Sequence, residues 1–151
     1  MWEDNGLMLR VLYYAKRISR IESSFYHYER GNVNAMSQGY GISAVRQMIS
    51  CATQLTEFFT SKPDGEKYRK TVYALQFLAK LNLVTSRFDW LREYHSIFPD
   101  CNCIINHIKP GTFSRNGYIR FLFVKYHMAW LFVLLFKFRN FINRGRNIAA
   151  R

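Results

Sequence analysis

The residues best suited to bind a metal ion lie close together in the second half of the chain. Cys101 and Cys103 are separated by one residue, His107 follows four residues later, and His95 precedes them. Thiolate and imidazole groups are ligands that Zn²⁺ prefers. The spacing, however, differs from the paired CxxC knuckles of structural zinc sites. We therefore predict free loop cysteines and no metal or cofactor, with a zinc site at Cys101, Cys103 and His107 as the alternative.

The sequence contains no recognisable catalytic motif. Its ten carboxylates form no pair suited to acid–base catalysis, and it has no GxSxG, P-loop or GxGxxG pattern. His27 stands among aromatic residues, where a histidine is more often packed and hydrogen-bonded than catalytic. We therefore predict that the protein is not an enzyme, with no catalytic residues and no small-molecule substrate.

The strongest chemical signal is the positive charge of the C-terminal third. The chain has a formal net charge of +12, and Asp100 is its last acidic residue. The residues that follow include nine bases: Lys109, Arg115, Arg120, Lys125, Lys137, Arg139, Arg144, Arg146 and Arg151. Such a surface attracts anionic partners, such as lipid headgroups or nucleic-acid phosphates. In the basic tail, residues 137–151, the predicted lipid- or phosphate-contacting residues are Arg139, Arg144, Arg146 and Arg151.

The elements that position these residues are all predicted to be helices. Apolar residues recur at helical spacing, and no stretch shows the two-residue alternation of a half-buried strand. We expect one bundle-like, all-α domain over residues 1–151. Its helices, about five in number, are expected at residues 5–31, 43–60, 64–79, 86–98 and 118–143.

Turns and caps predict where the middle helices begin and end. Residues 62–65 (KPDG) predict a turn, in which proline fixes φ and glycine tolerates positive φ. Asp64 is expected to cap the third helix, and Ser86 with Asp89 forms a capping-box pattern for the fourth. Residues 99–116 are predicted to form a loop. The buried face of the second helix is expected to carry Val45, Ile49, Ala52, Leu55 and Phe59.

The first predicted helix is basic as well as amphipathic. Asn5 is expected to cap it and Gly31 to end it. Between residues 5 and 21 it has four basic residues and no acid, a pattern similar to a mitochondrial targeting helix. The alternative is the solvated basic face of an ordinary bundle helix. The apolar face alternates spacings of four and three, through Leu7, Val11, Tyr14, Ile18, Ile21, Phe25 and Tyr28.

The last predicted helix includes a candidate transmembrane segment at residues 118–136. A spanning helix requires about 20 mostly apolar residues, whereas the uninterrupted apolar run covers only residues 128–136. The alternative is the central helix of a soluble bundle, and in both cases Leu131 and Leu134 are expected to be buried.

Four cations along this last segment bear on how it meets a membrane. On one continuous helix they would point in different directions, so the segment is not expected to lie flat on a bilayer. These cations are Arg120, Lys125, Lys137 and Arg139.

Together these features predict a non-enzymatic, membrane-embedded structural or accessory subunit of an organellar complex in the mitochondrial inner membrane. Its expected partners are the other subunits of that complex and anionic lipid. Three cysteines, an odd number, and acidic residues at positions 3 and 4 favour an intracellular location without a disulfide framework. The strongest alternative is a soluble, basic RNA-binding helical subunit of a ribonucleoprotein, in which basic residues contact phosphates and aromatic residues stack on bases.

A short stretch resembles the amphipathic helix of the PEX11 peroxisome-elongation family. The resemblance is carried by residues 58–67 (FFTSKPDGEK) and residues 73–79 (YALQFLA), with a spacing between them that differs from the family's by one residue. It covers about a seventh of the chain. The resemblance implies a second alternative, a peroxisomal membrane-remodelling protein.

Overall fold

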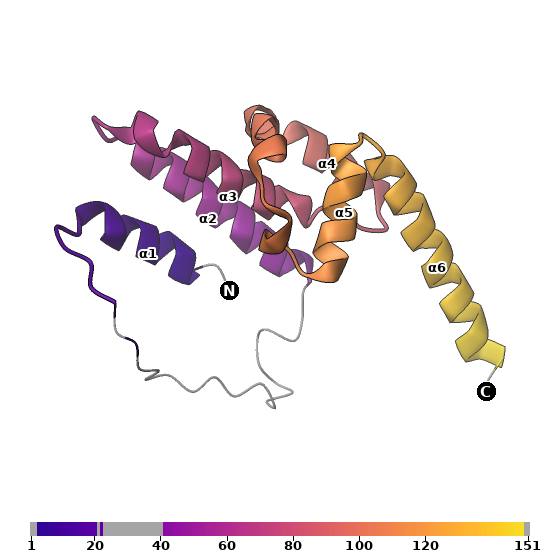
Figure 1. The fold of residues 1–151 in the computed structure, drawn as a ribbon. Coiled ribbons are helices and arrows are strands. Elements are labelled where there is room, and N and C mark those ends of the chain that lie inside the picture. The colour runs from indigo at the N-terminus through magenta and orange to yellow at the C-terminus, as the bar shows by residue number, and fades with distance from the viewer. Residues whose placement is uncertain (1–2, 21, 23–40, 150–151) are drawn as a thin grey trace.

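The computed structural model describes residues 3–20, 22 and 41–149, and every regular element in these residues is helical. Figure 1 shows the arrangement, in which α2 and α3 form a long hairpin and the later helices pack at one end of it. The prediction of an all-α fold is therefore confirmed. The α-helices are α1 (Glu3–Tyr14), α2 (Ile42–Thr60), α3 (Arg69–Leu81), α4 (Phe88–Ser96), α5 (Arg115–Lys125) and α6 (Ala129–Ala149). The 3-10 segments are η2 (Gly65–Tyr68), η3 (Pro99–His107) and η4 (Pro110–Thr112).

The hairpin of α2 and α3 closes through the predicted turn. The amide of Gly65 donates to the carbonyl oxygen of Lys62 over 3.1 Å. Gly65 does not have positive φ, so its role differs from the expected one. A Cβ atom at this position would overlap the backbone carbonyl of Phe59. Glycine therefore permits the close approach of the turn to the end of α2.

The predicted helix caps are not used. Asp64 makes no cap hydrogen bond, because its carboxylate accepts a hydrogen bond of 2.7 Å from the hydroxyl of Tyr13 in α1. This bond raises the pKa of Tyr13 to about 12. At the start of α4, Arg87 occupies the cap position without a side-chain cap, and the carboxylate of Asp89 pairs with Arg87 over 3.5 Å.

The main core lies where α3, α4, η3, α5 and α6 meet. Its least exposed members include Phe77 of α3, Cys101 of η3 and Val133 of α6. The ring of Phe77 meets that of Phe121 of α5 edge-on, with centroids 6.1 Å apart. Residues 99–116 are therefore not the predicted open loop, since η3 supplies buried side chains to this core.

The first helix is shorter than predicted, and a different face of it is buried. It ends at Tyr14, and Asn5 lies within it. Leu9 and Tyr13 pack against the end of α2, while Leu7 and Val11 are 66% and 53% exposed. Gly6 explains the choice of face, because a Cβ atom there would lie 2.9 Å from Cys51 Sγ. The predicted continuation of this helix through residues 21 and 25–31 falls outside the described residues.

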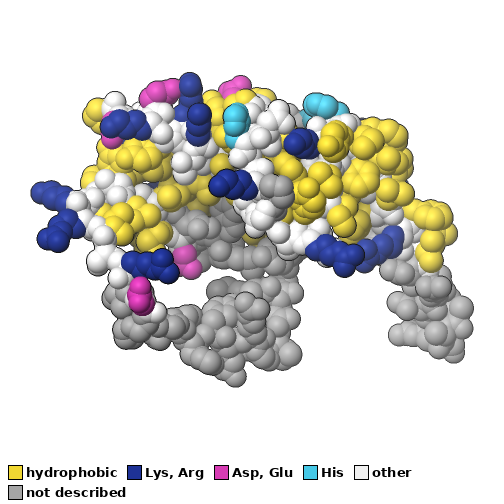
Figure 2. All heavy atoms as spheres, in the orientation of Figure 1, with side chains coloured by type: hydrophobic (Ala, Val, Ile, Leu, Met, Phe, Trp, Pro, Cys, Tyr) yellow, Lys and Arg dark blue, Asp and Glu magenta, His cyan; other side chains and the backbone are white. Residues whose placement is uncertain are grey.

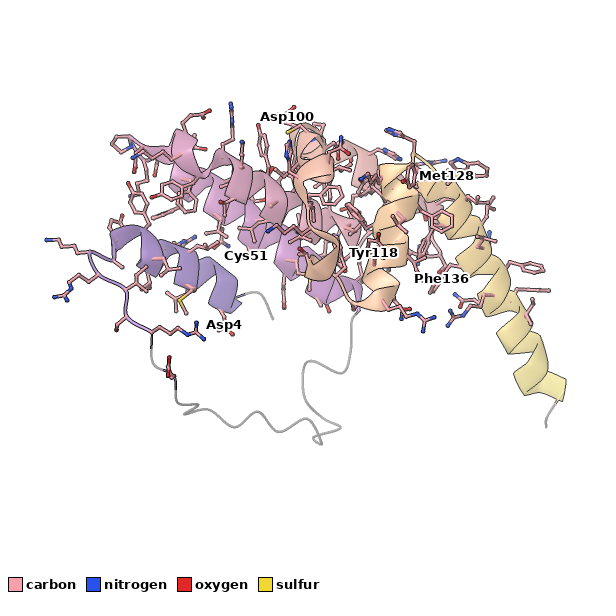
Figure 3. All side chains as sticks on the ribbon, in the orientation of Figure 1. Asp4, Cys51, Asp100, Tyr118, Met128 and Phe136 are labelled. Carbon is pink, nitrogen blue, oxygen red and sulfur yellow. The ribbon has the colours of Figure 1, made fainter. Side chains whose placement is uncertain are left out.

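The predicted helix at residues 118–143 is two helices. The chain leaves α5 in a Schellman motif, in which the amide of Met128 donates to Phe123 O over 2.7 Å and that of His127 to Val124 O over 3.1 Å. His127 adopts a φ of 59°, a conformation that most residues avoid. Figure 3 labels Met128 where the chain passes into α6. Residues 118–136 therefore do not form one continuous helix, and within the described residues no helix has the length and apolarity needed to cross a bilayer.

Candidate functional site

The outer side of α6 is a surface rich in exposed apolar side chains. On its inner side, Ala129, Phe132 and Val133 are buried in the core, and Phe136 stacks on Phe132 with centroids 5.3 Å apart. Figure 3 shows Phe136 on the side of α6 that faces α5. We define the outer face as the six large apolar residues that α6 leaves exposed on its other side: Trp130, Leu134, Leu135, Phe138, Phe141 and Ile142.

The spacing of the outer face follows the helix. Successive residues of an α-helix are about 100° apart, so residues separated by three or four positions share a side. Trp130, Leu134, Phe138 and Phe141 follow this spacing, and on a helical wheel Leu134 and Phe138 lie most nearly opposite the buried residues. Leu134 is 43% exposed, so the prediction that it is buried is wrong. A contiguous exposed patch of large apolar side chains usually marks a site that binds another protein or a membrane.

Basic side chains border the outer face. On a helical wheel, Lys137 and Arg139 lie at its two edges. Lys137 Nζ lies 6.0 Å from the ring centre of Phe88 in α4, and the Arg139 guanidinium carbon lies 5.1 Å from that of Phe136. Figure 2 shows the hydrophobic side chains gathered over the side of the molecule that α5 and α6 form, with Lys and Arg below them. No acidic residue follows Asp100 in the sequence, so α6 has no negative side chain of its own.

The structure places only part of the predicted arginine set. Arg139 is exposed on α6 beside the outer face. Arg144 and Arg146 belong to α6, but their side chains lie outside the described part of the chain, as does all of Arg151. Sequence reasoning did not select Lys137 or the outer apolar residues. The three- and four-residue spacing from Trp130 to Phe141 was the signal that could have found them.

The break between α5 and α6 also corrects the expectation that this segment cannot lie flat on a surface. Arg120 and Lys125 belong to α5, whereas Lys137 and Arg139 belong to α6. Their directions on one long helical wheel are therefore irrelevant. Considered alone, α6 has an apolar outer side with cations at its edges.

The cysteine and histidine residues are not brought together as a metal site. Within the described residues, no three His, Cys, Asp or Glu side chains form a group that could hold a metal ion. Cys101 points into the core while Cys103 and His107 are exposed on η3. Because neighbouring residues of a 3-10 helix face different sides, the short spacing separates the two thiols.

A second cluster of reactive side chains is closed inside the core. Lys80 is fully buried, and its ammonium group donates to the carbonyl oxygens of Ile97 and Phe98 over 3.1 and 3.0 Å. It also lies 4.8 Å from the ring centre of Tyr94 and beside Cys101. Burial lowers the pKa of Lys80, raises that of Tyr94, and raises that of Cys101 to about 11.

The position of this cluster indicates a structural role. Lys80 satisfies the last carbonyl groups after α4, where Phe98 has a φ of 46°. Lys80, Tyr94 and Cys101 are all buried, so a substrate would have to open the core to reach them. The protonated Cys101 thiol is also a poor nucleophile.

Comparison with protein-family models, curated proteins and solved structures finds no match for this chain. The PEX11 resemblance therefore rests on residues 58–67 and 73–79 alone. In the structure these residues form the end of α2, the turn and most of α3. The apolar side chains Val72 and Phe77 of α3 are buried in the protein, so this helix offers a membrane little of its apolar face.

Proposed function

We propose that the protein is a non-enzymatic membrane-surface protein that binds anionic bilayers through α6. The helix lies in the plane of the membrane interface, with its outer face in the boundary between headgroups and acyl chains. The observation that carries this proposal is the position of six exposed, large apolar residues on the side of α6 opposite the core. Helices of this kind insert about 5–10 Å into the interface and combine apolar burial with attraction to anionic lipid.

The residue types on α6 fit this position. Trp130 lies near the start of the helix, and tryptophan favours the interface between headgroups and hydrocarbon. Lys137 and Arg139 border the outer face, so their long side chains can reach lipid phosphates while the apolar residues between them insert. The helix has 21 residues, or about 32 Å of length along the surface.

Charge favours a lipid surface over an apolar protein groove as the partner. The chain has a net charge of +12, and its last 51 residues contain no acid. Each Lys or Arg near an anionic leaflet contributes about 1 kcal/mol of attraction. A neutral apolar groove on another protein would leave these charges unused. Membrane association is therefore the function that the shape and charge of α6 together support best.

The location and the complex remain predictions from the sequence. The basic, acid-poor segment at residues 5–21 is the basis for placing the protein in mitochondria, as an accessory subunit at the inner membrane. Within this segment Lys16, Arg17 and Arg20 are exposed. The RNA-binding alternative depends on the same positive charge, and the PEX11-like alternative also involves membrane contact. An experiment is therefore needed to separate them from the proposed function.

Vesicle flotation tests the proposed function directly. The purified full chain is mixed with vesicles of phosphatidylcholine alone, or of phosphatidylcholine with phosphatidylserine. We expect it to float with the anionic vesicles, to lose binding as salt rises, and to be released by alkaline carbonate. Failure to float with either vesicle, together with RNA binding that weakens steeply with salt, would favour the ribonucleoprotein alternative. Resistance to carbonate would indicate an embedded protein.

A further inference from the structure

A cavity of about 530 Å³, lined by both apolar and polar side chains, lies where the beginnings of α2 and α5 meet the end of α3. Residues from distant parts of the sequence line it, including Gly41, Asn82, Thr85, Trp90, Asn116 and Arg120. Its volume is in the range of small-molecule sites. None of its lining residues is acidic. No residue of α6 lines this cavity.

Arg120 provides this cavity with an uncompensated positive charge. One terminal nitrogen, Nη1, donates to Asn82 Oδ1 over 3.2 Å, and this is the only hydrogen bond of the guanidinium within the described structure. Its Nε atom is buried without a partner, as is the hydroxyl oxygen of Thr85 in the same cavity. Burial lowers the pKa of Arg120. Arg120 and Thr85 are half-buried. A half-buried charge without a counterion and polar atoms without partners are costly, and an anion bound beside the guanidinium would reduce that cost.

Two helix beginnings add positive potential to the same cavity. Gly41 caps α2 without a side-chain hydrogen bond, and α2 has no acidic residue in its first turn. Ser114 caps α5 by accepting from the amide of Gly117 over 3.4 Å, and α5 also begins without an acid. The first amides of a helix point outward and carry partial positive charge, which favours anions.

We propose that this cavity binds a phosphate group of a small ligand, with Arg120 as its principal contact. A guanidinium offers two parallel donors that match a phosphate, and backbone amides with the Thr85 hydroxyl can donate to the remaining oxygens. Arg120 also lines a second cavity of about 340 Å³ between α5 and α6, where Phe123, Phe132 and Leu135, the last at the edge of the outer face, are apolar neighbours. A phosphate that carries a hydrocarbon part can therefore place it beside Arg120. The phosphate belongs either to a soluble ester or to a lipid headgroup.

Nuclear magnetic resonance of the full chain tests the site. Inorganic phosphate and glycerol 3-phosphate are titrated at constant ionic strength, and the Arg120 Nε–H signal and the amides of Ile42 and Asn116 are followed. We expect saturable shifts at these positions and none with chloride. Arg120→Gln should weaken binding by about tenfold or more. Arg92→Gln removes the same charge from an exposed site on α4 and should leave binding unchanged.

A second variant and a vesicle arm complete the experiment. Thr85→Val keeps the charge but removes a hydroxyl donor, and it should weaken binding by severalfold even if Arg120→Gln fails to fold. Binding of glycerol 3-phosphate identifies a soluble ligand. Saturable Arg120-dependent shifts only with phosphatidic acid vesicles identify a lipid headgroup. No saturable binding by the wild type in either arm, or equal weakening by Arg92→Gln and Arg120→Gln, would overturn the proposal.

The two proposals fail independently. Arg120→Gln should still float with phosphatidylserine vesicles, because the outer face of α6 is unchanged. Loss of flotation without loss of phosphate binding would contradict only the membrane function.

Discussion

Removing two aromatic side chains from the outer face of α6 should separate membrane binding from folding. Phe138 is 64% exposed and Phe141 is 74% exposed, so neither contributes much to the core. We expect the double substitution Phe138→Ala and Phe141→Ala to weaken binding to anionic vesicles strongly. The melting temperature and helical circular dichroism should stay close to those of the wild type.

The size of this effect follows from the exposed area. A buried phenylalanine removes about 150–250 Å² from water, so the exposed fractions of these two side chains correspond to roughly 280 Å². At about 25 cal/mol per Å², complete transfer to hydrocarbon would stabilise binding by about 7 kcal/mol. Interfacial insertion reaches part of this area and alanine retains some of it. We therefore expect a loss of about 3 kcal/mol, or about 100-fold in affinity.

The assay is flotation with phosphatidylserine-containing vesicles over a range of lipid concentrations. The matched control is the double substitution Phe138→Leu and Phe141→Leu, which keeps both positions apolar and should bind within about fivefold of the wild type. If the alanine variant binds as tightly as the wild type, the outer face does not enter the membrane and the reasoning is wrong. Equal losses in both variants would instead indicate a partner that recognises the aromatic rings themselves.

Three further predictions concern the tail, the break between the last helices and the thiols. The four tail arginines are Arg139, Arg144, Arg146 and Arg151. Replacing all four with glutamine should weaken binding to anionic vesicles at low salt, since each arginine contributes about 1 kcal/mol, and should leave helicity unchanged. Replacing them with lysine should retain binding to a diffuse lipid surface. His127→Gly should raise the free energy of unfolding by up to about 1 kcal/mol and the melting temperature by about 2–4 °C, because glycine tolerates positive φ. His127→Val should lower both quantities in the same unfolding experiment. Iodoacetamide at pH 8 should modify Cys103 quickly and Cys101 only on unfolding. Cys101 is buried, and its pKa of about 11 keeps the thiol protonated at pH 8. Equal rates of modification of the two thiols, measured by mass spectrometry, would contradict the buried position of Cys101.

The sequence by itself determined the helical class and the central hairpin, because these features depend on local patterns. Apolar residues at helical spacing predicted α2 with its buried Val45, Ala52 and Leu55. Residues 62–65 predicted the turn before α3. The concentration of positive charge in the C-terminal third also follows from composition alone.

Only the tertiary structure decided which faces are buried. Leu7 and Val11 of α1 have the spacing of a core face, but the close approach of Gly6 to Cys51 turns them outward. Spacing shows that a helix has an apolar side, but it does not show whether a second apolar side exists or which one packs. For the same reason, the sequence did not predict that the outer face of α6 is exposed. An uninterrupted apolar run is expected to be buried on all sides unless the helices that pack against it are known.

The break at His127 and the cavity at Arg120 likewise depended on long-range packing. No glycine or proline marks residues 126–128, so the local sequence favours a continuous helix. Burying Phe121 and Val124 of α5 together with Phe132 and Val133 of α6 in one core requires the chain to change direction, and this burial offsets the cost of positive φ at His127. The cavity joins residues 41, 82 and 120, which no local pattern can place together.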